Sequence, residues 1–329
     1  MAQADYPSAA GRDHRVSIEV VVPVFNESAG VPALLARLAS CFAPAECERH
    51  GVAGVRFVFV DDGSTDRSAP LLAEAIRAGF PAVLYRLSRN FGHQAAVSAG
   101  LSYSEAELVA VMDADLQDPP EVIFEMLAAW RNGADVAYAV RRGRKENLLK
   151  RAGYHLFYRL YRYLAEVDVP LDSGDFALLD RRVVDSMEGL PEHLRFLRGL
   201  RTWVGFDQVP VAYERAAREF GRSKYGWSKL YQLATDGIAA MSVKPLRVVQ
   251  FALISSALVT VLLGTGLVAA AALASGLSAI EWWGMATILA ILATSSLNLV
   301  CLYILSAYIG RTYLEAKGRP AWIVREVVE

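Results

Sequence analysis

The chain has 329 residues and a formal net charge of −1. It has no overall excess of basic residues, so its net charge does not indicate a nucleic-acid partner. Hydrophobic residues make up 54% of the chain and its mean hydropathy is +0.26, which is high for a purely soluble protein. The three cysteines are odd in number and show no zinc-ligand spacing, so neither a disulfide framework nor a zinc site is predicted.

The N-terminal half alternates short apolar runs with helical patterns. Residues 1–15 are polar and contain no apolar stretch, so we expect a disordered lead rather than a cleaved signal peptide. Strands are predicted at 16–22, 55–60, 82–87, 107–112 and 135–140. Helices are predicted at 31–42, 66–79, 93–104 and 120–133. This alternation indicates βαβ units and therefore a doubly wound, mostly parallel α/β sheet.

Polar clusters follow four of the predicted strands. They are Pro23–Glu27, Asp61–Asp66, Asp113–Asp118 and Arg141–Lys145. Each alone can be a turn or a helix cap, and Asn26 and Asp66 are suitable cap residues. Because ligands of such sheets bind beyond the carboxyl ends of the strands, convergence at four strand ends favours a nucleotide-type site over coincidental caps.

The acidic run "MDADLQDPPE" is the most specific of these clusters. Asp113 and Asp115 are two residues apart and would share a face on an extended segment, with Gln117 next on that face. Carboxylate and amide oxygens suit Mg²⁺ or Mn²⁺. Asp118 precedes two prolines and is expected to cap the following helix. Since GxGxxG and P-loop patterns are absent, we expect Asp62 and Glu27 to accept hydrogen bonds from a nucleotide.

The C-terminal half carries two long uncharged runs, 248–280 and 282–310. Each exceeds the roughly 20 residues that cross a membrane, so we predict transmembrane helices at 248–274 and 284–309. A buried core helix is the alternative, but core helices rarely reach this length without a charge. Basic flanks predict that both ends lie in the cytoplasm: Lys244, Arg247, Arg311, Lys317, Arg319 and Arg325.

The remaining segments complete the expected domain organisation. A catalytic domain at 16–222 is followed by juxtamembrane helices at 223–247, and a cytoplasmic tail at 310–329 contains a short strand at 321–328. The segment 146–166 is basic and amphipathic. It fits a membrane-surface helix and a helix packed on the sheet equally well.

Several motifs together resemble a known family. "VVPVFNE", "VDDGSTD", "SRNFGHQAAVSAGL" and "MDADLQDPPE" resemble the inverting, GT-A-fold glycosyltransferases of family 2. "DSGDFALLDRR", "REFGRSKY" and "YIGRTYLEAKGRPAWIV" resemble the polyprenyl-phosphate branch, which includes dolichol-phosphate mannose synthases and bactoprenol-phosphate glucosyltransferases. The resemblance implies a UDP- or GDP-linked sugar donor, a polyprenyl (undecaprenyl) phosphate acceptor, Mg²⁺ or Mn²⁺, and the bacterial inner membrane. It leaves a homo-oligomer open.

The resemblance also implies roles for individual residues. The implied donor-binding positions are Pro23, Phe25, Glu27, Asp62, Asp113, Ala114, Arg218 and Lys224. The implied metal ligands are Asp113, Asp115 and Gln117, and the implied catalytic residues are Asp115 and Arg141. Arg141 would also meet the acceptor phosphate, together with Arg151, for which a snorkelling role on the 146–166 helix is equally plausible. Asp172 and Asp175 are interpreted as structural or sugar-contacting.

This assignment explains why no catalytic histidine is required. A lipid monophosphate is largely dianionic at neutral pH and is already a nucleophile. Two alternatives remain. A processive family 2 polysaccharide synthase would carry a Q/RxxRW signature, but "RGLRTW" has an additional Thr202 before Trp203, and two spans are too few for a channel. A non-catalytic membrane adaptor with the same fold has no need of the intact acidic pair.

Overall fold

The computed structural model describes residues 12–141, 173–193, 195–214, 242–273 and 277–329. The chain divides into two compact units, each described by itself. The first contains the described residues up to 214 and the tail from Arg319, and the second contains the described residues from 242 to Gly318.

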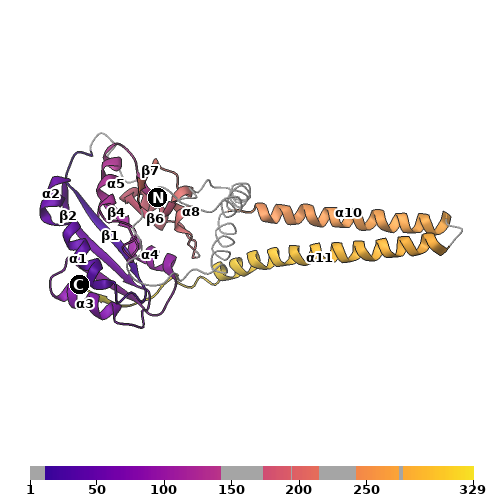
Figure 1. The fold of residues 1–329 in the computed structure, drawn as a ribbon, viewed down its shortest axis with the longest axis horizontal. Helices are drawn as coiled ribbons and strands as arrows, with labels where there is room; N and C mark the ends of the chain where they lie inside the picture. The colour runs from indigo at the N-terminus through magenta and orange to yellow at the C-terminus, as the bar shows by residue number, and fades with distance from the viewer. Residues whose placement is uncertain (1–11, 142–172, 194, 215–241, 274–276) are drawn as a thin grey trace. The chain divides into compact units, whose positions relative to one another are not determined.

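The first unit is built on one eight-stranded sheet (Figure 1). Its strands are β1 (Val16–Val24), β2 (Val52–Asp61), β3 (Ala82–Leu87), β4 (Leu108–Val111), β5 (Val136–Arg141), β6 (Ser173–Asp180), β7 (Gln208–Tyr213) and β8 (Val324–Val328). Their order is β7-β5-β6-β4-β1-β2-β3-β8. Only β6 and β8 run antiparallel to their neighbours, so the mostly parallel sheet predicted from the sequence is confirmed.

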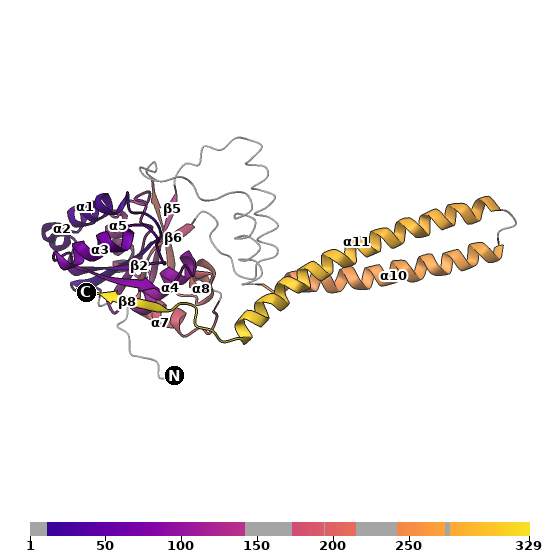
Figure 2. The ribbon, with the colours of Figure 1, turned by 90° about the horizontal axis from the view of Figure 1, so that it is seen from below.

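Helices cover both faces of this sheet. They are α1 (Val31–Cys41), α2 (Pro44–Arg49), α3 (Ser68–Arg77), α4 (His93–Ser102), α5 (Val122–Arg131), α7 (Arg181–Glu188) and α8 (Leu197–Trp203). Figure 2 shows α1, α3 and α5 on one side and α4, α7 and α8 on the other. Consecutive residues of β1, such as Val20, Val21 and Val22, are therefore all buried, which explains the near-continuous apolar runs in the sequence.

Three residues were predicted as helix caps: Asn26, Asp66 and Asp118. Asp66 accepts hydrogen bonds from the backbone N–H and the hydroxyl of Ser68, but the N-cap residue of α3 is Arg67, so Asp66 lies one residue before the predicted cap position. Asn26 caps no helix and instead accepts a bond from the backbone N–H of Thr65. The prediction for Asp118 is wrong, because α5 begins only at Val122 and the Asp118 side chain is buried.

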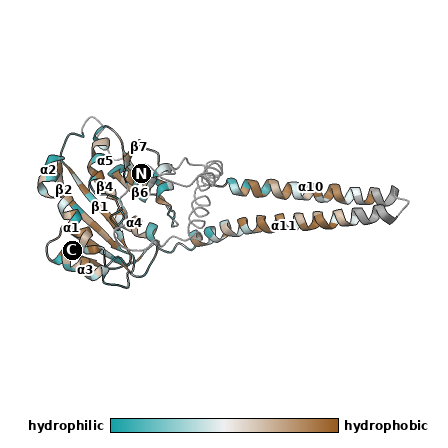
Figure 3. Ribbon diagram, viewed as in Figure 1, coloured by the Kyte–Doolittle hydropathy of each residue, from teal (hydrophilic) through white to brown (hydrophobic). Residues whose placement is uncertain are grey.

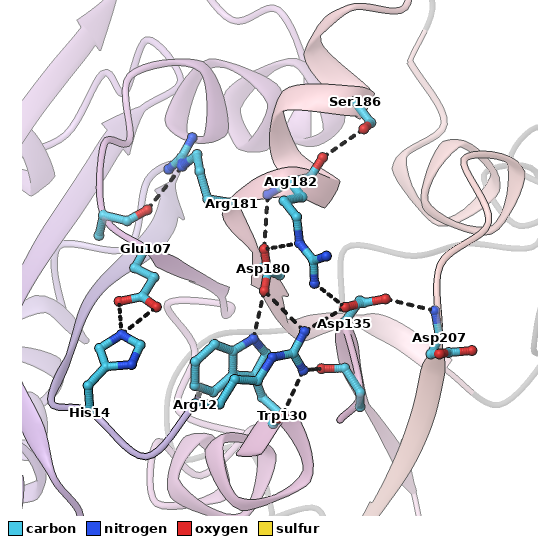
Figure 4. Close-up of polar contacts among 12 residues, drawn as sticks. Arg12, His14, Glu107, Trp130, Asp135, Asp180, Arg181, Arg182, Ser186 and Asp207 are labelled. Carbon is cyan, nitrogen blue, oxygen red and sulfur yellow. Dashed lines mark hydrogen bonds and ion pairs between the residues drawn. The ribbon is translucent and has the colours of Figure 1, made fainter. Parts of the chain in front are cut away.

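Of the predicted disordered lead, residues 1–11 lie outside the described residues, and the prediction is wrong for residues 12–15. Residues 12–15 are ordered, and the guanidinium of Arg12 is buried against the sheet (Figure 4). It donates to the carbonyl oxygens of Trp130 and Ala134 at 2.8 and 2.7 Å and lies 2.7 Å from the carboxylate of Asp135. We refer to Arg12, Trp130, Asp135, Asp180 and Arg182 as the Arg12 cluster.

Close packing of α4 on the sheet depends on Gly100. A methyl group at this position would overlap Val21 Cγ1 and lie 3.2 Å from Val60 Cγ2, and both valines are fully buried. We expect Gly100→Ala to lower the free energy of unfolding by about 1–3 kcal/mol through overpacking. The matched control is Gly54→Ala, where a methyl group meets nothing within 4 Å. Equal thermal midpoints for the two variants would contradict this packing argument.

The second unit contains two long apolar helices, α10 (Lys244–Leu273) and α11 (Leu277–Ala316), which pack against each other (Figures 1 and 3). The stretches Lys244–Gly266 and Gly284–Ala316 are long enough to cross a membrane, and their most apolar 18-residue windows have mean hydropathies of 2.0 and 2.2. Only 11% and 6% of their most apolar windows are buried, so the alternative of buried core helices does not fit them. Most of the predicted juxtamembrane segment, and all of 146–166, lie outside the described residues.

Candidate active site

The described residues of the predicted polar clusters lie at one edge of the sheet; residues 142–145 of the fourth cluster lie outside the described residues. Phe25 follows β1, Asp62 follows β2, Asp113 follows β4, and Arg141 ends β5. These four strands run in the same direction, so their carboxyl ends lie at a common edge. Because β6 is antiparallel, it brings its beginning, with Asp175, to the same edge.

The acidic run after β4 forms a turn. Leu116 has a φ of 55°, and the backbone N–H of Gln117 donates to the Asp115 carboxylate at 3.2 Å. The extended segment that we expected here is therefore wrong, and simple alternation does not determine which way Asp113, Asp115 and Gln117 point. Ala114, between the two aspartates, is buried and anchors the turn in the core.

His93, the first residue of α4, lies between two carboxylates. Its Nε2 atom lies 3.3 Å from Asp175 Oδ2 and 3.8 Å from Asp113 Oδ1. Burial alone would lower the pKa of His93, but the hydrogen bond with Asp175 and the charges of Asp113 and Asp175 raise it to about 9. The imidazole is therefore protonated at neutral pH, and it links the acidic turn to β6.

Asp113 and Asp175 respond to this environment in opposite ways. Desolvation raises the pKa of Asp113 to about 6, and the charges of Asp118, Asp175 and Asp115 add to the rise while His93 opposes it. Burial also acts against ionisation of Asp175, but Arg198 and His93 hold its pKa well below the usual range. The edge thus concentrates negative charge at the Asp113 turn.

Asp175 is held by three side chains. The Arg198 Nε atom lies 3.0 Å from Asp175 Oδ1, and the Gln94 amide donates to Asp175 Oδ2 at 2.9 Å. Gln94 also accepts a bond from the backbone N–H of Leu197 at 2.9 Å. The carboxylate therefore fastens α4 and α8 to the beginning of β6. The choice between a structural and a sugar-contacting role for Asp175 stays a prediction.

Arg141 reaches the acidic turn through Tyr213. The Arg141 Nε atom donates to the Tyr213 hydroxyl at 3.4 Å, and that hydroxyl donates to Asp118. Burial and the neighbouring Asp118 raise the pKa of Tyr213 to about 12, so the phenol stays protonated. The structure thus brings Arg141 and the acidic run together through Tyr213 and the buried Asp118.

The expected nucleotide side of the site is formed by two interlocked loops. The Asp62 carboxylate accepts bonds from the backbone N–H groups of Phe91 and Gly92, at 2.7 and 3.0 Å. Burial raises the pKa of Asp62, although these backbone bonds oppose the rise. Gly63 has a φ of 68°, and a methyl group there would lie 2.5 Å from the carbonyl carbon of Arg89. The turn after β2 and the loop at 88–92 are therefore fixed against each other.

The other predicted donor residues border this turn. Pro23 is buried in β1, whereas Phe25 is 36% exposed at its end. The backbone N–H of Glu27 donates to the Ser68 hydroxyl at 2.9 Å. Arg151, Asp172, Arg218 and Lys224 lie outside the described residues, so their assignments stay predictions.

Sequence reasoning missed three contributors to this edge: His93, Arg198 and Tyr213. His93 stands in the quoted motif "SRNFGHQ", which marked the segment without giving the histidine a role. Arg198 and Tyr213 follow the segment at 142–172, and nothing in their local sequence indicates that they meet Asp175 and Asp118.

Comparison with known proteins assigns the family. The profile of "Glycosyl transferase family 2" matches residues 19–187, which include most of β1 and all of α4, the acidic turn and β6. The chain belongs to glycosyl transferase family 2. The resemblance seen in the sequence is thereby confirmed, as is the α/β fold class, with its mixed sheet and two following apolar helices.

Similar family 2 glycosyltransferases align over almost their whole length. Uncharacterized glycosyltransferase YkcC of Bacillus subtilis is 38% identical over 317 residues, 94% of each chain. The prophage bactoprenol glucosyl transferase homolog of Escherichia coli is 32% identical over 314 residues, 95% of this chain and 99% of its own. Among solved structures, a mannosyltransferase of Pyrobaculum calidifontis in complex with GDP-Man and Mn²⁺ has a TM-score of 0.45 at 16% identity, covering 92% of this chain and 88% of its own.

Proposed function

We propose that this family 2 glycosyltransferase moves a sugar from a nucleotide-sugar donor to a membrane polyprenyl phosphate. The observation that carries the proposal is the similarity to proteins named bactoprenol glucosyl transferase, which extends over 94–95% of this chain and includes both apolar helices. An acceptor that is itself a membrane lipid gives a physical reason for the helices, because anchoring lowers the entropic cost of bringing enzyme and acceptor together.

The acidic turn is proposed to bind Mg²⁺ or Mn²⁺ and the donor diphosphate. Asp113 and Asp115 offer carboxylate oxygens and Gln117 an amide oxygen, which is the donor set that these hard cations accept. No group of three or more His, Cys, Asp and Glu side chains is arranged to hold an ion by itself within the part of the chain that the structure describes. We therefore infer that diphosphate oxygens complete the shell. A bound ion would stabilise the departing diphosphate.

Arg141 is proposed to act on the acceptor. Two anions must approach each other, and a guanidinium at the end of β5 neutralises the incoming phosphate. Tyr213 positions that guanidinium by accepting from its Nε atom, 3.4 Å away. Arg218 and Lys224 are proposed to bind the donor diphosphate, and Arg151 is a second proposed contact to the acceptor phosphate.

The bond changes follow from this arrangement. A phosphate oxygen of the acceptor forms a bond to the anomeric carbon while the bond from that carbon to the diphosphate breaks. The acceptor oxygen is already ionised, so no proton has to be removed. Attack opposite the leaving group inverts the anomeric centre, for example from an α-linked donor to a β-linked lipid product.

The two apolar helices are proposed to cross the bacterial inner membrane. Lys244 and Arg247 begin α10, whereas Arg311, Lys317 and Arg319 lie near the end of α11. By the positive-inside rule, the catalytic domain and both termini face the cytoplasm.

A donor screen tests the proposed function. The purified full chain is incubated with undecaprenyl phosphate, one of several UDP- or GDP-hexoses, and Mn²⁺ or Mg²⁺, and the lipid product is identified by mass. We expect the lipid to gain one hexose with one donor class, and chelation of the metal to stop the reaction. A ladder of products would favour the processive synthase, and no turnover with any donor would favour the adaptor.

A further inference from the structure

The C-terminal strand β8 completes the sheet beside the expected donor loops. It pairs antiparallel with β3, and Arg86 lies opposite Glu326 in this register (Figure 2). In the parallel pairing of β2 with β3, Arg86 also lies opposite Asp61. Asp61, Arg86 and Glu326 therefore form a row across three neighbouring strands.

The charges in this row alternate in sign and form two ion pairs. Arg86 Nη1 lies 2.6 Å from Glu326 Oε2, and Arg86 Nε lies 3.7 Å from Asp61 Oδ2. The Asp61 side chain is only 1% exposed, so its negative charge depends on neighbouring groups for stabilisation. Glu326 and Arg86 are 43% and 31% exposed. Glu326 in the C-terminal tail thus holds the guanidinium of Arg86, which faces the buried carboxylate of Asp61.

Asp61 belongs to the turn that is expected to meet the nucleotide. Its Oδ1 atom accepts a bond from the backbone N–H of Ser64 at 3.3 Å, which closes the turn around Asp62. The tail meets the second donor loop as well, because the backbone N–H of Ser88 donates to the carbonyl oxygen of Ile323 at 2.8 Å. Both loops that fix Asp62 are therefore tied to residues that follow α11 in the chain.

We propose that Glu326 and Arg86 are positioning residues for the donor nucleotide and that the C-terminal tail forms part of the donor site. Glu326 orients Arg86, Arg86 stabilises ionised Asp61, and Asp61 holds the turn that carries Asp62. This inference rests on the proposed function only in taking the donor to be a nucleotide sugar, and it assumes nothing about the acceptor. Loss of the row loosens the two loops that hold Asp62 and leaves the acceptor side at Arg141 and Tyr213 unchanged.

Binding of UDP and GDP, each with Mn²⁺, to the full chain tests this role by calorimetry. We expect Glu326→Gln to weaken binding of the preferred nucleotide by about two- to fivefold, as for a partly exposed ion pair. Arg86→Gln should weaken it by about tenfold or more, because it leaves buried Asp61 without its cation. In the double variant the two effects should not add, since both act through one pair.

The tail offers a matched control. Glu329 at the chain end pairs with Arg56 in β2, with 3.3 Å between Nη2 and Oε1, away from the carboxyl end of that strand. Glu329→Gln should leave nucleotide binding unchanged. Unchanged binding in Glu326→Gln, or an equal loss in Glu329→Gln, would overturn the inference.

The readout separates this inference from the acceptor proposal. Nucleotide binding needs no polyprenyl phosphate, so failure of sugar transfer to that lipid leaves the comparison of variants intact. Failure of the unmodified chain to bind either nucleotide would overturn the donor site at this edge and the positioning role with it.

Discussion

Replacing Asp115 by alanine is expected to lower the rate of sugar transfer by about 10²–10³-fold while the protein remains folded. The side chain lies in the turn that follows β4, beyond the buried part of the strand, so its removal leaves no cavity in the core. Its loss removes one of two proposed carboxylate ligands, and with it the cation that would stabilise the departing diphosphate. The measurement is the turnover rate at saturating donor, with the unfolding midpoint recorded alongside.

Glu121 provides the matched control for Asp115. It belongs to the same acidic run but is 46% exposed and pairs at the surface with Arg37, at 2.8 Å. Glu121→Gln removes one negative charge near the site without touching the proposed ligands, so turnover should stay near that of the unmodified chain. Near-normal turnover in Asp115→Ala, or an equal loss in Glu121→Gln, would remove the metal assignment.

Most of the strands that could be predicted from the sequence are buried on both faces. Strands such as β1 and β4 are covered on both faces, so their apolar runs are continuous and stand out against polar turns. Strand β7 escaped prediction because the side chains along Gln208–Ala212 stay partly or fully exposed and only Tyr213 is buried. Its role depends on pairing with β5, which no local pattern encodes.

Some residues of the candidate site could likewise be predicted from the sequence, whereas others could not. Strand ends point to one edge by a rule of α/β sheets, so Asp62, Asp113 and Arg141 could be grouped before the structure was known. The contact between His93 and Asp175 joins residues 82 positions apart through an antiparallel strand, and it follows only from the register of β6 with β4 and β5. Asp118 was misassigned because the two prolines after it resemble a helix start, whereas buried pairing with Tyr213 determines its role.

Arg12→Met is expected to destabilise the first unit by about 3 kcal/mol, which is the lower end of the cost of breaking a buried ion pair. The side chain of Arg12 is 4% exposed and that of Asp135 is 13% exposed, so water cannot replace the lost bonds. Arg182 retains a contact to Asp135 at 2.6 Å and to Asp180 at 3.1 Å, which limits the loss. Methionine preserves the apolar stem but removes the guanidinium donor from the carbonyl oxygens of Trp130 and Ala134. The Trp130 carbonyl oxygen keeps the backbone N–H of Gly133 as a donor at 2.9 Å.

Arg15 separates this effect from a general loss of charge. It lies three residues further on and pairs with Glu48 at 2.9 Å, but the two side chains are 62% and 72% exposed. Arg15→Ala should therefore change the unfolding midpoint by little, since exposed pairs contribute about 0–1 kcal/mol. The Arg12 cluster holds the beginning of β5 and the end of β6, at the edge opposite Arg141 and Asp175. At temperatures well below its unfolding midpoint, the Arg12→Met variant should bind the donor as tightly as the unmodified chain. A selective loss of donor affinity at those temperatures would show that the cluster shapes the site rather than the stability of the sheet.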